Sequence, residues 1–128
     1  DDVESRGLGD VYKRQILNSA EKTKTIDFYT NSVPESAQTV PSLPVGRIVE
    51  LYGNYDDYAS NKPNTIQMNV QVDVWVSTLK EVDAFYFALD EAMRAEGWEC
   101  TYTEQTDDED LEGAKRIIKR YVATISLN

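Results

Sequence analysis

Residues 65–77, TIQMNVQVDVWVS, alternate apolar and polar side chains without a break. The apolar side chains occupy every second position, at Ile66, Met68, Val70, Val72, Val74 and Val76. This period of two predicts a β-strand that has one apolar face and one polar face. Such a strand is about twice as long as the usual five or six residues. We therefore expect it either to twist strongly or to project in part beyond the core.

The polar face of this strand is a candidate interaction surface. Its side chains are short and rich in hydrogen-bonding groups: Gln67, Asn69, Gln71 and Asp73, followed by the apolar Trp75. We expect such a face to meet either water or a polar surface of another subunit. Tyr55 and Tyr58 are candidates for the same interface because tyrosine is enriched at interfaces, although the anchoring of a loop explains them equally well.

Residues 77–98, STLKEVDAFYFALDEAMRAEGW, predict a long amphipathic helix over residues 79–96. Its apolar residues recur at spacings of three and four, at Leu79, Val82, Phe85, Tyr86, Leu89, Ala92 and Met93. Thr78 and Glu81 form a capping box, and Gly97 supplies the left-handed residue that ends the helix. An aromatic ligand box is the alternative, but this spacing is typical of a core face. We expect the helix to cover all six apolar residues of the long strand.

Four further segments predict shorter strands, namely residues 26–32, 43–53, 98–105 and 114–127. In the third of these segments, Trp98, Cys100 and Tyr102 are expected on one face, as the alternation of side chains requires. Strands and helix together predict an α+β fold, with a mostly antiparallel sheet of about four to five strands and one long amphipathic helix on one face.

The sequence also predicts the conformation of two connections between these elements. The polar residues 54–64, NYDDYASNKPN, predict a loop that is long for a hairpin connection, and loops of this length are often functional or mobile. Residues 106–113, TDDEDLEG, predict a second capping box, Thr106 with Glu109, that opens a single helical turn ending at Gly113.

The N-terminal stretch SRGLGDVYKRQ, residues 5–15, resembles the translation of a sequencing adapter. DVYKRQ is similar to the transposase-recognition end of such an adapter, and SRGLG is similar to the primer sequence that precedes it. We therefore expect residues 1–15 to be derived from an adapter, which excludes them from reasoning about the fold. Residues 16–128 are then expected to form a single domain.

The charge and the missing residue types limit the chemistry. The chain has a net charge of -10, which repels nucleic-acid phosphates and anionic membranes, so neither is an expected partner. It has no histidine, and its one cysteine, Cys100, has no histidine to activate it. No glycine-rich phosphate loop is present. We expect no catalytic residues, no cofactor and no metal.

The densest acidic cluster comprises Asp107, Asp108, Glu109 and Asp110. If Asp108 were the first position of a calcium loop, Lys119 would occupy the twelfth position, where a bidentate glutamate is required. A solvated acidic turn near a helix start is the favoured interpretation.

The order of several segments resembles a siphophage tail-component family that is similar to the tail terminators of phages with long non-contractile tails. The segments are FYTNSVPES, the long alternating strand, the helix ending in EGW, TDDEDLEG and KRYVATISL, which span residues 26–127. The N-terminal helix of that family is truncated or replaced by the adapter, and the acidic turn lacks the family's proline and lysine.

The resemblance implies a structural protein of the virion tail, assembled in the host cytoplasm. Such proteins form a hexameric ring, a homo-oligomer that caps the tail tube protein and joins the tube to the head connector proteins. The truncated N-terminal helix would pack beside the long helix. Asp107, Asp108 and Asp110 would line an acidic channel that repels DNA over a Debye length of about 8 Å.

A second function class remains open. An acidic, phage-encoded decoy protein could mimic DNA and inhibit a host nucleic-acid-binding protein. A decoy requires carboxylates at phosphate-like spacing along exposed helices, whereas here the acidic residues gather in turns and at helix ends.

Overall fold

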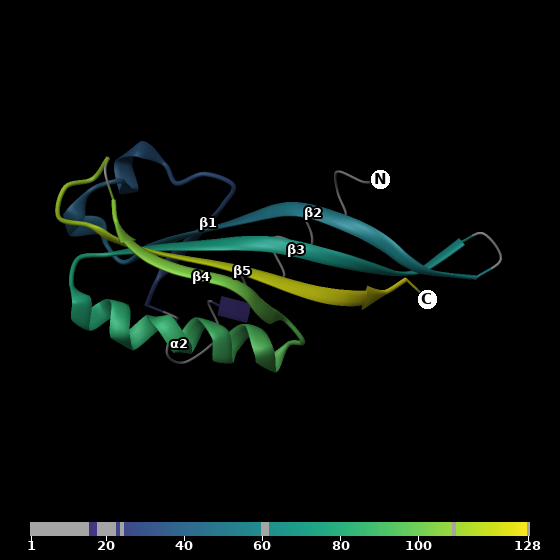
Figure 1. Cartoon of the computed structure of the whole chain (residues 1–128). Helices are drawn as coiled ribbons and strands as arrows, with labels where there is room; N and C mark the ends of the chain where they lie inside the picture. The colour runs from purple at the N-terminus through teal and green to yellow at the C-terminus, as the bar shows by residue number, and fades with distance from the viewer. Residues whose placement is uncertain (1–15, 18–22, 24, 60–61, 109, 128) are drawn as a thin grey trace.

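The computed structural model describes residues 16–17, 23, 25–59, 62–108 and 110–127 (Figure 1). Residues 1–15 and most of the expected N-terminal helix lie outside these ranges, so their adapter origin stays a prediction. Ile16 and Leu17 are helical, and Leu17 is fully buried. No helix within the described ranges is long and apolar enough to cross a membrane.

Five strands form one sheet, and one long helix packs on one of its faces (Figure 1). The strand order across the sheet is β1 (Asp27–Thr30), β2 (Val45–Ala59), β3 (Lys62–Val76), β5 (Lys115–Ser126) and β4 (Glu99–Asp107). Only β1 and β2 pair in parallel, and the other three pairs are antiparallel. The predicted α+β fold with a mostly antiparallel sheet is therefore confirmed.

Strands β2 and β3 form a hairpin that is longer than predicted, with 15 residues in each strand. The expected loop over residues 54–64 is wrong, because Asn54 pairs with Gln67 and Ala59 with Lys62. The hairpin extends beyond the other strands in Figure 1. Residues 56–64 near its tip are mostly polar, so their sequence resembles that of a loop.

The helix α2 spans Leu79–Ala95, as the capping signals predict. The Thr78 hydroxyl accepts a hydrogen bond from the Glu81 amide at 3.1 Å, and the Glu81 carboxylate accepts one from the Ser77 amide at 3.3 Å. The first bond satisfies an amide group that the first turn of a helix leaves without a partner, and the second ties the residue before the N-cap to the helix. Gly97 follows the helix with a φ of 89°, the left-handed conformation expected of it.

The core lies between α2 and the helix side of the sheet. Many of its buried side chains come from β3, α2 and β5: Val70, Val72, Val74, Val76, Val82, Phe85, Leu89, Met93, Ile117 and Tyr121. The connection between β1 and β2 contains two short 3-10 helices, η1 (Glu35–Ala37) and η2 (Val40–Ser42), and lies at the end of the sheet where β3 leads into α2 (Figure 1).

The helix is too short to cover all of β3. Its 17 residues rise about 26 Å, whereas the 15 residues of β3 extend about 50 Å. Ile66 and Met68 are accordingly only half-buried. The expectation that α2 covers all six apolar residues of the long strand is therefore wrong for these two, which lie toward the projecting end of the hairpin.

Strand β4 departs from the predicted alternation. Its pairing with β5 shifts between Cys100, which opposes Tyr121, and Tyr102, which opposes Arg120. The extra residue of this β-bulge turns Tyr102 to the face opposite the helix, whereas Trp98 and Cys100 stay on the core side. The predicted common face for Trp98, Cys100 and Tyr102 is therefore wrong for Tyr102.

The predicted helical turn after Thr106 is also wrong. Thr106 and Asp107 continue β4 and pair with Arg116 and Lys115. No helix forms in the described residues between β4 and β5. The Asp108 carboxylate accepts a hydrogen bond from the Asp110 amide at 2.8 Å, which builds a local turn in place of a helix cap.

Candidate functional site

The candidate site lies on the open face of the sheet, opposite α2. At its centre is Asp73, whose side chain has 0% exposure. Arg47 donates from Nη2 to one carboxylate oxygen of Asp73 at 2.9 Å, and Arg116 donates from Nη2 to the other at 2.8 Å. Both arginines also donate from Nε to the same oxygens at 3.2 Å. Each oxygen of the buried carboxylate thus accepts two hydrogen bonds from one arginine, and these charged partners are the condition for its burial.

Strand pairing brings these side chains together. Arg47 on β2 lies directly opposite Asp73 on β3, and Arg116 on β5 lies opposite Trp75. Residues that oppose each other across a ladder point to the same face of a sheet. The guanidinium carbons of Arg47 and Arg116 lie 5.5 and 5.3 Å from the centroid of the Trp75 ring, within the range of cation–π attraction.

The polar network continues across the sheet toward β4. Gln71 donates from Nε2 to Asp73 at 3.1 Å and accepts a hydrogen bond from Arg120 Nε at 3.1 Å. The Arg120 guanidinium carbon lies 5.2 Å from the centroid of the Tyr102 ring, and the Tyr102 hydroxyl donates to Glu104 at 2.5 Å. This bond to a carboxylate raises the pKa of the Tyr102 phenol. We call these linked side chains of β2, β3, β5 and β4 the arginine network.

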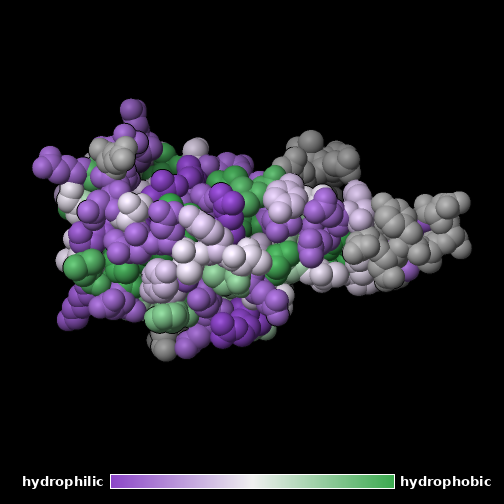
Figure 2. Space-filling view, in the orientation of Figure 1, coloured by the Kyte–Doolittle hydropathy of each residue, from purple (hydrophilic) through white to green (hydrophobic). Residues whose placement is uncertain are grey.

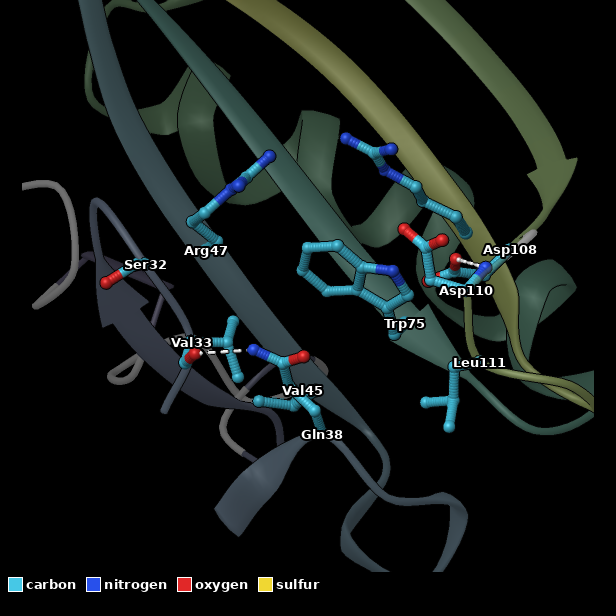
Figure 3. Close-up of a pocket in the computed structure, with 10 residues that line it drawn as sticks. Ser32, Val33, Gln38, Val45, Arg47, Trp75, Asp108, Asp110 and Leu111 are labelled. Atoms are coloured by element: carbon cyan, nitrogen blue, oxygen red, sulfur yellow. Dashed lines mark hydrogen bonds between the residues drawn. The ribbon is translucent and has the colours of Figure 1, made fainter. Parts of the chain in front are cut away.

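A cavity of about 300 Å³ opens beside this network (Figure 3). Val45, Trp75 and Leu111 give it an apolar lining, and Arg47 and Arg116 lie along the same cavity. In Figure 3, Ser32, Val33 and Gln38 come from the β1–β2 connection on one side, whereas Asp108 and Asp110 come from the β4–β5 turn on the other. The Gln38 side chain donates to the Val33 carbonyl at 2.8 Å and ties the first wall together.

The predicted interface residues do not share one face. Gln67, Asn69 and Gln71 lie on the open face, and the Asp73 carboxylate is enclosed by its arginines. Tyr55 lies opposite Ile66, so its side chain is on the helix side of the sheet. The side chain of Tyr58 lies outside the described part of the structure. Whether these residues form a subunit interface stays a prediction.

The three acidic channel candidates lie close together after β4. Asp107 is exposed and forms an ion pair with Lys115 at 3.1 Å. Asp108 is half-buried, and Asp110 is exposed. Their role in lining a channel stays a prediction. Among the described residues, no group of histidine, cysteine, aspartate and glutamate side chains has a geometry suited to a metal ion.

A second polar cluster lies between α2 and the sheet and was not predicted. Lys119 has 0% exposure and forms an ion pair with Asp90 of α2 at 3.1 Å. Its ammonium group also donates to Thr103 at 3.0 Å and lies 4.0 Å from the Tyr86 ring centroid. Asp90 accepts a further hydrogen bond from the Tyr121 hydroxyl at 2.8 Å. The available signal was the position of Lys119 midway between the apolar residues Ile117 and Tyr121 on one face of β5.

The cluster influences two titratable groups. Burial, followed by the hydrogen bond to Asp90, raises the pKa of the Tyr121 phenol far above its ordinary value. Burial also raises the pKa of the Cys100 thiol, and the negative charge of Asp90 adds to this effect. Both groups therefore stay protonated near neutral pH, and a protonated thiol is a poor nucleophile.

Comparison with solved structures finds similarity over nearly the whole chain. A chain in the structure described as "Virion of native gene transfer agent (GTA) particle" superposes with a TM-score of 0.51 and 14% sequence identity. The alignment covers 97% of this chain and 91% of that chain. No protein-family model matches the sequence, and no curated protein matches it. The similarity shows that this chain shares its fold with a protein of that particle.

Proposed function

We propose that this chain is a structural component of a phage-like virion and that it acts there as a tail terminator. It would form a hexameric ring on the last ring of the tail tube, stop the polymerisation of the tube and present a surface to the head connector. This function is mechanical and requires no catalytic turnover.

The observation that carries the proposal is the fold shared with a chain of the gene transfer agent virion. The similarity extends over 97% of this chain and 91% of that chain, so it concerns the whole subunit. The order of segments in the sequence independently resembles the tail-terminator family. The two lines of support agree on a virion component, and the second one narrows the proposal to the tail.

The open face of the sheet supports a role in assembly. Gln67 and Asn69 continue the polar face of β3 beyond the arginine network toward the projecting hairpin. On this face the buried Asp73 joins side chains from β2 and β5. A polar face of this kind suits either a subunit contact or a channel wall, and a closed ring uses such a surface in the same way in every copy.

The alternative function, an acidic decoy of DNA, has less support. The open face carries three arginines, Arg47, Arg116 and Arg120, and their positive charge opposes mimicry of phosphates there. The exposed charged residues of α2 are two acidic ones, Asp83 and Glu91, and two basic ones, Lys80 and Arg94, so this helix carries no continuous acidic row.

The test is to mix the purified protein with polymerising tube subunits and to image the products by electron microscopy. We expect short tubes that carry an additional ring at one end. Tubes of the same uncontrolled length as in the absence of the protein, with no density at their ends, would contradict the proposal. Tight binding to a host nuclease in place of the tube would favour the decoy.

A matched pair of variants tests whether the open face of the sheet takes part in capping. Gln67→Glu adds a negative charge to the face, and we expect it to weaken capping because the ring would place this charge close to other acidic copies. Ser36→Glu adds the same charge to η1 and should cap tubes as the unchanged protein does. Equal capping by both variants would exclude the outer part of the open face from the assembly.

A further inference from the structure

We infer that an apolar platform on the helix side of the projecting hairpin receives the outer face of α2 from a second copy of the chain. These would be the two surfaces that meet between neighbouring copies of the proposed ring. The contact depends on the proposed function in one respect, namely that several copies of the chain are present in one assembly.

The platform is built by strand register. Tyr55, Ile66 and Ile125 oppose one another across β2, β3 and β5 and form one row. Gly53, Met68 and Ala123 form the neighbouring row on the same face. Leu127 continues β5 beyond these rows, where its amide donates to the Asn64 carbonyl at 2.8 Å.

The platform is exposed although it is apolar. Tyr55 is 55% exposed, Ile125 is 42% exposed and Leu127 is 46% exposed. Figure 2 shows hydrophobic surface between the end of α2 and the projecting hairpin. The chain's own helix cannot cover this surface, because α2 is about half as long as β3. Clustered apolar surface of this kind marks a contact site.

The outer face of α2 has the complementary properties. Phe87 is 69% exposed, the highest exposure among the large hydrophobic side chains of the described residues. The edge of the Tyr86 ring packs against it with the two centroids 5.3 Å apart, which restrains the Phe87 ring. The exposed side chains around it are small or oppositely charged in pairs: Ala84, Lys80, Asp83, Glu91 and Arg94. An apolar centre within a charge-balanced rim is the usual anatomy of a protein interface.

The charge distribution of the chain favours contact between two copies through these two surfaces. Copies of a chain with a net charge of -10 repel one another, so contact between them is least costly where both surfaces are neutral. The platform rows contain no charged residue, and the rim of Phe87 carries two positive and two negative charges. A Phe87 ring would pack there against Tyr55, Ile66 and Met68, a favourable combination for an aromatic side chain.

The two surfaces cannot meet within one chain. The inner face of α2 packs on the sheet through Val82, Phe85 and Leu89, so Phe87 points away from the sheet that carries the platform. The contact is therefore between different patches of two copies. Repetition of such a heterologous contact generates a ring when the rotation that relates neighbouring copies brings the last copy back to the first.

Cysteine cross-linking tests this contact even if the copies associate weakly. In a Cys100→Ser background, Ala84→Cys places a thiol beside Phe87 and Ile125→Cys places one on the platform. Mild oxidation of the chain that carries both substitutions should produce a ladder of covalent oligomers. An equal mixture of the two single variants should stop at dimers, because each copy then has only one thiol.

Two further variants of the doubly substituted chain establish specificity. Adding Phe87→Glu should reduce the cross-linked yield at least about tenfold, as expected for loss of a central aromatic anchor. Adding Leu79→Glu, which alters a residue of α2 that is 59% exposed but lies away from Phe87, should leave the ladder unchanged. Unchanged thermal midpoints would establish that all variants are folded.

The outcomes separate this inference from the proposed function. Absence of a ladder, or a ladder that is insensitive to Phe87→Glu, would overturn the platform contact even if the protein caps tubes. A ladder that depends on Phe87 in a protein that leaves tube growth unchanged would support the contact and contradict the terminator.

Discussion

Asp73 organises the open face because its carboxylate holds arginines from both neighbouring strands. A buried carboxylate is tolerated only when charged partners and hydrogen bonds replace water, and here Arg47, Arg116 and Gln71 do so. In the sequence, Asp73 looks like the other polar residues of its strand. Its burial depends on which residues lie opposite it on β2 and β5, and the sequence of β3 alone does not contain that information.

Replacing Asp73 with asparagine should therefore destabilise the protein. Asp73→Asn keeps the shape of the side chain but leaves two arginines close together without their carboxylate, which should cost about 3 kcal/mol of the free energy of unfolding. Asp110→Asn, at an exposed position, should cost less than about 0.5 kcal/mol. Urea denaturation of both variants measures the difference, and equal stabilities would show that the arginine network does not hold the strands together.

The reactivity of Cys100 should report its raised pKa. Alkylating reagents attack the thiolate, and burial next to Asp90 favours the protonated thiol. At pH 8 we expect iodoacetamide to modify the folded protein more slowly than the urea-unfolded chain, and the rate in the folded protein to continue rising with pH after the unfolded chain has reached its plateau. Coincident pH profiles for the two states would contradict this environment for Cys100.

Among the strands, the parallel pair of β1 and β2 depends on a close approach. Phe28 of β1 lies directly opposite Gly46 of β2, and a Cβ atom on residue 46 would overlap the Phe28 ring. Both residues are buried. The absent side chain at this position therefore lets the Phe28 ring approach the backbone of β2 closely.

Gly46→Ala should destabilise the protein by about 2 kcal/mol, because the added methyl group forces the ring out of its position. Phe28→Leu should also be destabilising, but the double variant should lose less than the sum of the two single changes, since the smaller side chain makes room for the methyl group. Thermal or urea denaturation of the four proteins measures this coupling. Additive losses would contradict a direct contact between the two positions.

The assignment of faces on β3 can be tested by placing charges on each side. Val72→Asp inserts a charge into the buried core face and should prevent folding. Gln67→Lys lies at an exposed position of the open face and should change the thermal midpoint little. Circular dichroism of the two variants gives the comparison. Similar thermal midpoints would reverse the assignment of the faces.

At the level of elements, sequence patterns predicted α2 and the inner part of β3 well, because their core faces repeat regularly and the ends of α2 carry capping residues. They failed where burial does not set the pattern. Residues 56–64 of the hairpin are mostly polar, so no apolar alternation marks them as strand, and the bulge before Tyr102 depends on pairing with β5. The arginine network was missed for the same reason, since it joins side chains that are far apart in the chain.

The whole molecule combines a helix-covered half with a sheet that extends beyond it (Figure 1). The covered half contains the core, the ion pair between buried Lys119 and half-buried Asp90 and, on the opposite face, the arginine network. The extended half exposes an apolar platform on one face and the polar residues of β3 on the other. A subunit of this form is well suited to continue its packing in a neighbouring copy, which is the basis of the proposed ring.

The most direct test of this account is the mass of the purified protein in solution, measured by native mass spectrometry with and without a tail tube protein. We predict that the tube protein drives the chain into a closed, hexameric ring, even if the chain alone associates weakly. A chain that remains a monomer at saturating concentrations of its tube protein would contradict the account.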